Sequence, residues 1–275
     1  MRPRRTVFYL SDRTGITAEV LGKTLLTQFP GVEFRKRLIP FIDTPEKAEA
    51  ALQEIADTTR HEAQRPIVIS TLINDDLRHM VEKANALCLD LFDGFIGKLE
   101  GELNVQSSHA LGLTHGIGDA SLYERRMAAV NYALAHDDGL SPSHYNDADI
   151  ILVGVSRSGK TPTCLYIAMQ YGVQAANYPL TSDDFENMAL PKSLTPFRSK
   201  LYGLTISPER LAKIRHERKP DSHYSSIETC RAEVRAAEDL LQRARVPYLD
   251  TTTKSIEEIA ITILHKSGAA ARLPM

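Results

Sequence analysis

A glycine-rich segment in the second half of the chain has the residue types and spacing needed to hold phosphate. Gly154-Val-Ser-Arg-Ser-Gly-Lys-Thr161 carries every fixed residue of the pattern G-x-x-x-x-G-K-[ST]. In such a loop the glycines let backbone N–H groups turn toward phosphate oxygens, the lysine neutralises the terminal phosphates, and the hydroxyl ligates Mg²⁺. We therefore predict that Lys160 is catalytic and Thr161 is a metal ligand. The predicted nucleotide-binding residues are Gly154, Val155, Ser156, Arg157, Ser158, Gly159, Lys160 and Thr161.

The residues on either side of this loop predict the structure that positions it. The apolar run 149–153 before the loop is typical of a buried strand, and the pattern over 160–171 after it is typical of a helix. A helix that starts at the loop adds the positive end of its dipole to the phosphate site. Arg157 within the loop either adds a bidentate phosphate contact or faces solvent.

The motif alone does not identify the reaction, since motors, GTPases, metabolite kinases and protein kinases all use it. Asp183 and Asp184 follow an expected strand, where a carboxylate is well placed to accept the proton of an attacking hydroxyl. We predict both as catalytic residues, with a helix cap as the alternative role. The aspartate that accompanies the metal in such sites has two candidates here: Asp250, after the run 246–249, and the pair Asp183 and Asp184.

Three other groups of polar residues carry weaker signals. Ser11–Glu19 follows the first expected strand and forms either a second anion cradle or a turn capped by Thr14 or Thr17. His136-Asp-Asp-Gly139 could act in acid–base catalysis or bind a metal. These residues also fit the C-terminal end of a helix, and we favour that interpretation. The basic helix end around Arg215 is expected to be a solvated face.

Alternation of apolar runs with helical patterns predicts an α/β fold in both halves of the chain. We place an N-terminal βαβ-type domain at 1–143, including a glycine-rich connecting segment at about 101–120, and a P-loop kinase-like domain with a mainly parallel sheet at 144–275. The expected strands are 7–10, 32–42, 66–73, 149–153, 173–178, 201–206 and 246–249. The expected helices are 17–29, 45–63, 75–99, 121–136, 160–171, 208–218, 227–243 and 256–266.

Composition narrows the class of protein. The 275 residues are 43% hydrophobic and 25% charged, which is typical of a globular protein able to bury its own core. Lys+Arg 33 against Asp+Glu 35 lacks the basic excess of a nucleic-acid binder, so we expect no nucleic-acid partner. The 3 cysteines fit neither a disulfide framework nor a zinc site. Because no apolar run is long enough to span a membrane and no signal peptide is evident, we expect a cytoplasmic protein without a membrane partner.

Several sequence blocks, in one order along both halves, resemble a known family. They are Phe8-Tyr-Leu-Ser-Asp-Arg-Thr-Gly-Ile-Thr-Ala-Glu-Val20, His136-Asp-Asp-Gly139, Gly154-Val-Ser-Arg-Ser-Gly-Lys-Thr-Pro-Thr163, Ala175-Ala-Asn-Tyr-Pro179 and Leu201-Tyr-Gly-Leu-Thr-Ile-Ser-Pro-Glu-Arg210. The chain resembles the phosphoenolpyruvate synthase regulatory proteins, bifunctional kinase/pyrophosphorylases related to the regulators of pyruvate, phosphate dikinase. At Gly159 and His136 the chain resembles the branch that regulates the synthase more than the branch that regulates the dikinase.

The resemblance implies two activities and a partner. Such proteins inactivate phosphoenolpyruvate synthase by phosphorylating a threonine with ADP as donor, and they remove that phosphate with inorganic phosphate, releasing pyrophosphate. The resemblance assigns the 154–161 loop to ADP, with Mg²⁺ at Thr161. Two alternatives stay open at this point: a P-loop kinase for a small metabolite, and a non-catalytic regulator that senses ADP and docks on the synthase. A homodimer is compatible with a regulator that embraces a large partner, although no heptad pattern argues for it.

Overall fold

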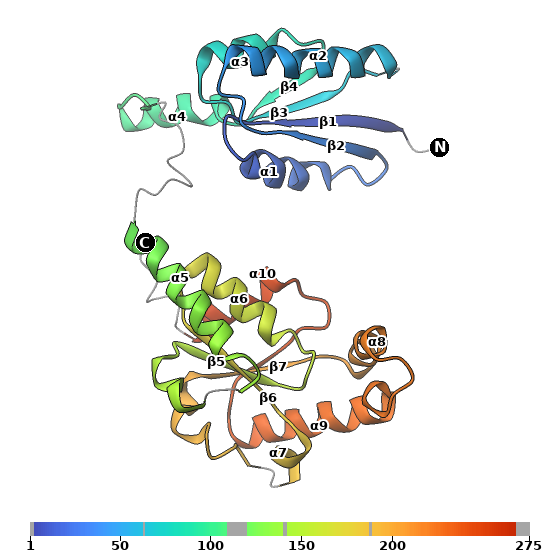
Figure 1. Cartoon of the computed structure of the whole chain (residues 1–275), viewed down its shortest axis with the longest axis vertical. Helices are drawn as coiled ribbons and strands as arrows, with labels where there is room; N and C mark the ends of the chain where they lie inside the picture. The colour runs from blue at the N-terminus through green and yellow to red at the C-terminus, as the bar shows by residue number, and fades with distance from the viewer. Residues whose placement is uncertain (1–2, 63, 109–119, 140–141, 187–188, 268–275) are drawn as a thin grey trace. The chain divides into compact units, whose positions relative to one another are not determined.

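The chain folds into two compact units, each built around its own parallel sheet (Figure 1). The computed structural model describes residues 3–62, 64–108, 120–139, 142–186 and 189–267. Contacts divide the chain into Met1–Gly118 and Asp119–Met275. Both sheets have four strands, all parallel, with helices between the strands. The predicted α/β class is therefore confirmed.

The first unit has the strand order β2-β1-β3-β4. Its strands are β1 (Arg4–Leu10), β2 (Glu33–Ile39), β3 (Ile67–Ser70) and β4 (Leu87–Asp90), and its helices are α1 (Ile16–Leu26), α2 (Pro45–His61), α3 (Asp75–Glu82) and α4 (Asp93–Leu103). Phe8 and Leu10 pack with residues of α2 and α3 on one face, whereas Val7 and Tyr9 pack with residues of α1 on the other. This alternation along β1 is the expected period of two for a strand covered on both faces.

The predicted long helix over 75–99 is wrong, because a strand interrupts it. The helix α3 ends at Glu82, and Leu87–Asp90 pairs in parallel with Ile67–Ser70 of β3 as the fourth strand. The apolar residues of this stretch happen to match a helical spacing, but the backbone N–H groups of Leu87 and Leu91 bond to the carbonyls of Pro66, just before β3, and Ser70, its last residue. Pairing with the open edge of β3 therefore determines the structure of this stretch and overrides its local helical pattern. Asn74 caps the start of α3, since its Oδ1 accepts from the Leu77 N–H at 3.1 Å.

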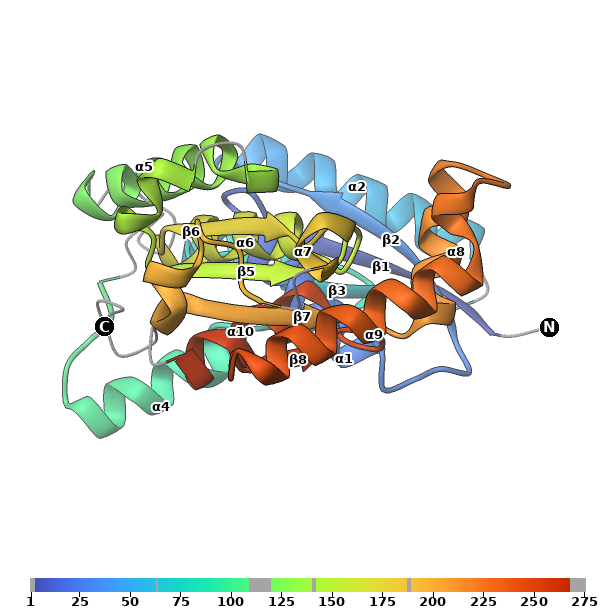
Figure 2. The ribbon, with the colours of Figure 1, turned by 90° about the horizontal axis from the view of Figure 1, so that it is seen from below.

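The second unit has the equivalent order β6-β5-β7-β8 (Figure 2). Its strands are β5 (Ile150–Gly154), β6 (Ala175–Pro179), β7 (Leu201–Thr205) and β8 (Tyr248–Asp250). Its helices are α5 (Ala120–Ala135), α6 (Lys160–Tyr171), α7 (Ser182–Glu186), α8 (Pro208–Arg218), α9 (Ile227–Arg243) and α10 (Ile256–Ser267), with the 3₁₀ turns η1 (Asp137–Gly139), η2 (Pro142–Asp147), η3 (Thr195–Lys200) and η4 (His223–Ser225). Residues of α5, α6 and α10 share one core on one face of the sheet, and residues of α9 pack on the other.

The division between the units lies earlier than the predicted boundary at 143/144. The helix α5 belongs to the second unit, because Ala129 and Ala133 are buried in the same core cluster as Cys164 and Ile167 of α6. Packing of this helix determines where the second unit begins. Of the predicted connecting segment 101–120, the first residues belong to α4, and 109–119 lie outside the described residues.

Two further features concern the whole described chain. All 3 cysteines are free thiols, as their spacing predicts. Within the described ranges, no helix is both long and apolar enough to cross a membrane.

Candidate functional site

The 154–161 segment lies at the carboxyl edge of the second sheet, in the predicted context. It leaves β5, the strand that pairs with both β6 and β7, and it runs directly into α6. In open parallel sheets a strand flanked in this way marks the crevice where ligands bind. The strand, loop and helix predicted around the motif are therefore confirmed.

Glycine is required at the first and second fixed positions for different reasons. A Cβ on Gly154 would collide with the Leu204 carbonyl oxygen of the neighbouring strand β7. Gly159 meets no such neighbour, but its φ of 94° is in the left-handed region, where it ends the loop and caps α6. Glycine is therefore needed at 154 because the neighbouring backbone is too close for a side chain, and at 159 because the backbone is left-handed.

A buried hydroxyl group from the end of the sheet holds the loop in place. Thr251 Oγ1 lies 3.1 Å from the Ser158 carbonyl oxygen and 3.0 Å from that of Thr205 at the end of β7. The hydroxyl of Ser158 itself is buried and has no hydrogen-bond partner among the described residues. A buried donor without an acceptor is costly, and a phosphate oxygen in the loop would satisfy it.

Lys160 lies folded against the loop that precedes it. Its side chain is 4% exposed, and Nζ donates to the Val155 carbonyl oxygen at 2.9 Å. Burial lowers the pKa of Lys160 to about 8, against the opposing effect of the nearby carboxylates of Asp138 and Asp137. The lysine is therefore a poorly solvated cation that gains from an anion placed within the loop.

The structure brings Asp137 into the site, although the sequence favoured a helix end for this segment. Thr161 Oγ1 donates to Asp137 Oδ1 at 2.7 Å, and Asn177 Nδ2 donates to the same oxygen at 2.5 Å. Asn177 is buried at the middle of β6, and its amide oxygen accepts from the Asp138 N–H at 3.1 Å. His136 is also buried, stacked on Tyr132 with ring centroids 3.9 Å apart. His136 thus packs in the unit, while the next residue, Asp137, contacts Thr161 at the end of the loop.

Asp138 has a strained backbone next to this cluster. Its φ is 50°, in the left-handed region that a non-glycine residue rarely adopts, and its side chain is exposed. Strain of this kind persists only where the surroundings impose it, and it concentrates at functional sites. Asp138 is a solvent-accessible carboxylate, and its charge opposes the burial that lowers the pKa of Lys160.

The aspartates proposed from sequence lie elsewhere along the same edge of the sheet. Asp184 caps the start of α7, where Oδ2 accepts from the Thr181 N–H at 2.9 Å, and Oδ1 accepts from the Tyr178 hydroxyl at 3.3 Å. Asp183 is exposed on the same short helix. Asp250 holds the turn after β8 by accepting from the Thr252 N–H at 2.9 Å. A catalytic role for Asp183 and Asp184 stays a prediction, and the carboxylate that contacts Thr161 is that of Asp137.

The turn after β1 in the first unit shows part of what was expected of Ser11–Glu19. Gly15, with φ 76°, is the N-cap of α1 and no side chain caps the helix, so the predicted cap by Thr14 or Thr17 is wrong. Asp12 is buried, and its carboxylate accepts from the Ile73 N–H at 3.0 Å across the ends of β1 and β3. The suggested anion cradle stays a prediction.

The donor set near Thr161 suits a hard divalent cation. The Thr161 hydroxyl and the Asp137 carboxylate supply oxygen atoms, which Mg²⁺ prefers. Among the described residues no cluster of three or more histidine, cysteine or acidic side chains could hold a metal on its own. Mg²⁺ typically binds through one or two protein oxygens together with substrate phosphates, so this small donor set fits it.

Comparison with known proteins gives matches over nearly the whole chain. A family model described as "Kinase/pyrophosphorylase" matches residues 7–264. A protein of Laribacter hongkongensis named "Putative phosphoenolpyruvate synthase regulatory protein" is 50% identical over 273 residues, which cover 99% of this chain and 100% of the relative. Proteins with the same name from Aromatoleum aromaticum and Ectopseudomonas mendocina are 54% and 50% identical, covering 95% and 98% of this chain and 95% and 99% of theirs.

Proposed function

The chain belongs to the kinase/pyrophosphorylase family, and on that premise we propose that it is a bifunctional regulator of phosphoenolpyruvate synthase. In one direction it transfers the β-phosphoryl group of ADP to a threonine of the synthase, and in the other it removes that group with inorganic phosphate. The observation that carries the proposal is the loop of the second unit, where a buried lysine lies folded on the loop and a buried serine hydroxyl group has no partner among the described residues.

The loop suits ADP because it binds a diphosphate whether or not a third phosphate is present. The backbone N–H groups of the loop and the N-terminus of α6 attract the α- and β-phosphates. Lys160, released from the Val155 carbonyl, would place its charge against the β-phosphoryl group as that group leaves AMP. The electrostatic gain is large because the lysine is already removed from water.

Thr161 and Asp137 would hold Mg²⁺ together with the phosphates. When bound, the ion would neutralise charge on the transferred group and help to orient it. Asn177 positions Asp137 by donating to the oxygen that Thr161 also contacts. This arrangement gives the sequence block Ala175–Pro179, which forms β6, a role in the site.

The acceptor hydroxyl needs a base, and Asp138 has the better position among the candidate carboxylates. It is exposed, so that a protein substrate can reach it, and its charge acts on Lys160. The exposed side chain of Asp183 and the capping carboxylate of Asp184 remain the alternative. In the forward direction the base accepts the threonine proton as the oxygen bonds to phosphorus and AMP departs.

The reverse activity uses the same residues of the loop, but inorganic phosphate replaces the threonine hydroxyl as the nucleophile. An oxygen of inorganic phosphate attacks the phosphothreonine phosphorus, the bond to the threonine oxygen breaks, and that oxygen recovers a proton. The products are pyrophosphate and free threonine, so no further reactant is needed. A loop that binds the diphosphate of ADP also suits pyrophosphate, which supports one pocket for both directions.

Transfer of isotope tests the proposal. Purified protein is incubated with phosphoenolpyruvate synthase, Mg²⁺ and ADP labelled in the β-phosphate, with labelled ATP in parallel, and the label is located by peptide mass. We expect label on a synthase threonine with ADP as donor. Lys160→Met should abolish transfer, whereas Lys213→Met, which changes an exposed lysine of α8, should not.

Two results would contradict the proposal. Inhibition of the synthase by a folded Lys160→Met variant, without label transfer, would indicate a regulator that acts by docking. Label found on a small metabolite rather than on the synthase would indicate a metabolite kinase.

A further inference from the structure

A buried arginine lies directly behind the phosphate loop. Arg215 of α8 has a fully buried side chain, the bulkiest such side chain among the described residues. The sequence predicted a solvated basic helix end here, which is right for the exposed Lys213, Arg218 and Lys219 but wrong for Arg215. Burying a guanidinium group is costly unless most of its donors are bonded, so its partners show what the position requires.

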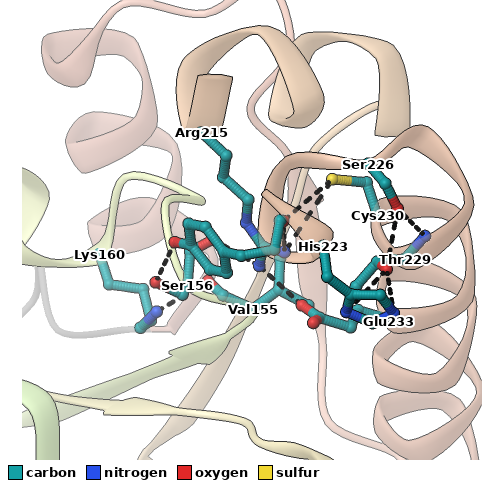
Figure 3. Close-up of polar contacts among 10 residues, drawn as sticks. Val155, Ser156, Lys160, Arg215, His223, Ser226, Thr229, Cys230 and Glu233 are labelled. Carbon is teal, nitrogen blue, oxygen red and sulfur yellow. Dashed lines mark hydrogen bonds and ion pairs between the residues drawn. The ribbon is translucent and has the colours of Figure 1, made fainter. Parts of the chain in front are cut away.

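The partners of Arg215 come from three separate segments (Figure 3). Nη2 donates to the Glu233 carboxylate of α9 at 2.6 Å and to the Ser156 carbonyl oxygen within the phosphate loop at 3.2 Å. Nη1 donates to the Tyr224 carbonyl oxygen of η4 at 3.1 Å. The Tyr224 ring lies beneath the guanidinium carbon at 4.1 Å from its centroid, and the Tyr224 hydroxyl is 3.0 Å from Ser156 Oγ. One side chain therefore connects the loop to α9 and η4.

The bond to Ser156 determines the direction of the next N–H group. Across a trans peptide the carbonyl and the following N–H point to opposite sides. No peptide of the chain's described part is cis, so the Ser156 carbonyl drawn toward Arg215 directs the Arg157 N–H away from it. Arg157 has φ 76° and follows Ser156 in a turn that the Ser158 N–H closes on the Val155 carbonyl oxygen at 3.3 Å, so the bond from Arg215 holds the orientation of the central peptide of this turn.

Stability alone gives a poor reason for this arrangement. A buried arginine with its partner is often no more stabilising than apolar side chains of the same volume. Glu233 is 29% exposed, so water already weakens the ion pair. A lysine could pair with Glu233, but only a planar fork of donors can also reach two backbone carbonyls. Arginine is therefore required here by the positions of the Ser156 and Tyr224 carbonyl groups.

We propose that Arg215 is a positioning residue that holds the Ser156 carbonyl outward, keeps the Arg157 N–H directed at the phosphate site, and couples the loop to η4. The inference rests on the proposed function in one respect, that the loop binds a diphosphate. Arg215 acts through the backbone and does not itself touch the ligand. Because ADP and pyrophosphate share the diphosphate group, Arg215 should contribute equally to the binding of both.

Binding titrations of matched variants test this role. Arg215→Lys keeps the charge but loses the fork, while Glu233→Gln keeps an acceptor for the fork but loses the ion pair. Arg231→Lys is the control, because Arg231 lies on the surface of α9, the helix that carries Glu233, and pairs with the exposed Glu209 of α8. Each variant is titrated with Mg²⁺-ADP and, separately, with Mg²⁺-pyrophosphate, and its urea midpoint is measured without ligand.

We expect Arg215→Lys to bind both ligands ten- to a hundredfold more weakly, the range expected for loss of a charged hydrogen bond that orients the site. Glu233→Gln should lower the urea midpoint while its affinity stays within about threefold of wild type, and Arg231→Lys should change neither. If Arg215→Lys does not fold, Tyr224→Leu removes the ring beneath the guanidinium and should weaken both ligands several-fold.

The role is wrong if affinity follows the urea midpoint across all variants, or if Arg215→Lys binds pyrophosphate as tightly as wild type does. Wild-type protein that binds neither ADP nor pyrophosphate would instead overturn the proposed function together with this inference. The two failures are therefore distinguishable within one set of titrations.

Discussion

The pH dependence of ADP binding should follow the protonation of Lys160. In the unliganded protein, burial lowers the pKa of this lysine to about 8. A bound diphosphate brings negative charge to Nζ and raises the pKa again, so binding above pH 8 requires uptake of a proton. Below pH 8 the lysine is charged before and after binding. Affinity should thus be level up to about pH 8 and fall above it.

The magnitude follows from the fraction of charged lysine. With a pKa of about 8, roughly one molecule in eleven carries the Lys160 charge at pH 9, so affinity should be about tenfold weaker there, or about 1.4 kcal/mol. The unfolded chain holds this proton up to about pH 10.5, so it binds more protons than the folded protein between pH 8 and 10.5. The free energy of unfolding of the unliganded protein should therefore rise across that window, by up to about 3 kcal/mol from this group.

Calorimetric titration with Mg²⁺-ADP from pH 7 to 9.5, in buffers of different ionisation enthalpy, measures both affinity and proton uptake. Burial raises the pKa of the nearby Cys164 thiol and raises that of Tyr145 to about 12, so neither group titrates in this range. Lys160→Arg keeps its charge throughout and is the matched control. A level wild-type profile, or an equal fall in wild type and Lys160→Arg, would refute the reasoning.

Two further predictions concern the loop and the candidate base. Gly154→Ala should destabilise the second unit by roughly 2 kcal/mol or more, because its Cβ meets the Leu204 carbonyl, whereas Gly159→Ala should lose only about 1 kcal/mol from its left-handed φ. Urea unfolding measures both, and equal losses would contradict the packing argument. Asp138→Asn should lower transfer to the synthase about a hundredfold or more at saturating ADP, while Asp184→Asn should lower stability by at most about 1 kcal/mol and keep transfer. Loss of transfer in Asp184→Asn alone would move the base to α7.

Much of the second unit could be predicted because its local signals agree with its packing. The bounds of α6, α8 and α9 match the expected helices, since glycine or serine caps mark where each one begins. The strand β5 and the loop after it were equally clear, because a buried strand, a glycine motif and a helix start coincide in sequence. Agreement between local pattern and tertiary structure explains this success.

The errors arise where contacts between distant residues decide the outcome. Leu87–Asp90 has helical spacing, and only its pairing with β3 makes it a strand. Asp137 follows a helix, as many aspartates do, and its role appears only through Thr161, twenty-four residues later. Arg215 lies among basic residues typical of a solvated surface, yet its partners Ser156 and Glu233 bury it. No local pattern distinguishes these residues, although the block around Asp137 was already part of the family resemblance.

The most direct test of the account is a round trip of one labelled phosphate. The synthase is first phosphorylated with ADP labelled in the β-phosphate, freed of nucleotide, and then incubated with this protein and unlabelled inorganic phosphate. We predict that the label leaves the threonine and appears in pyrophosphate, at the same rate at which synthase activity returns, and that a Lys160→Met variant releases none. Recovery of the label as inorganic phosphate would show simple hydrolysis and would contradict the account.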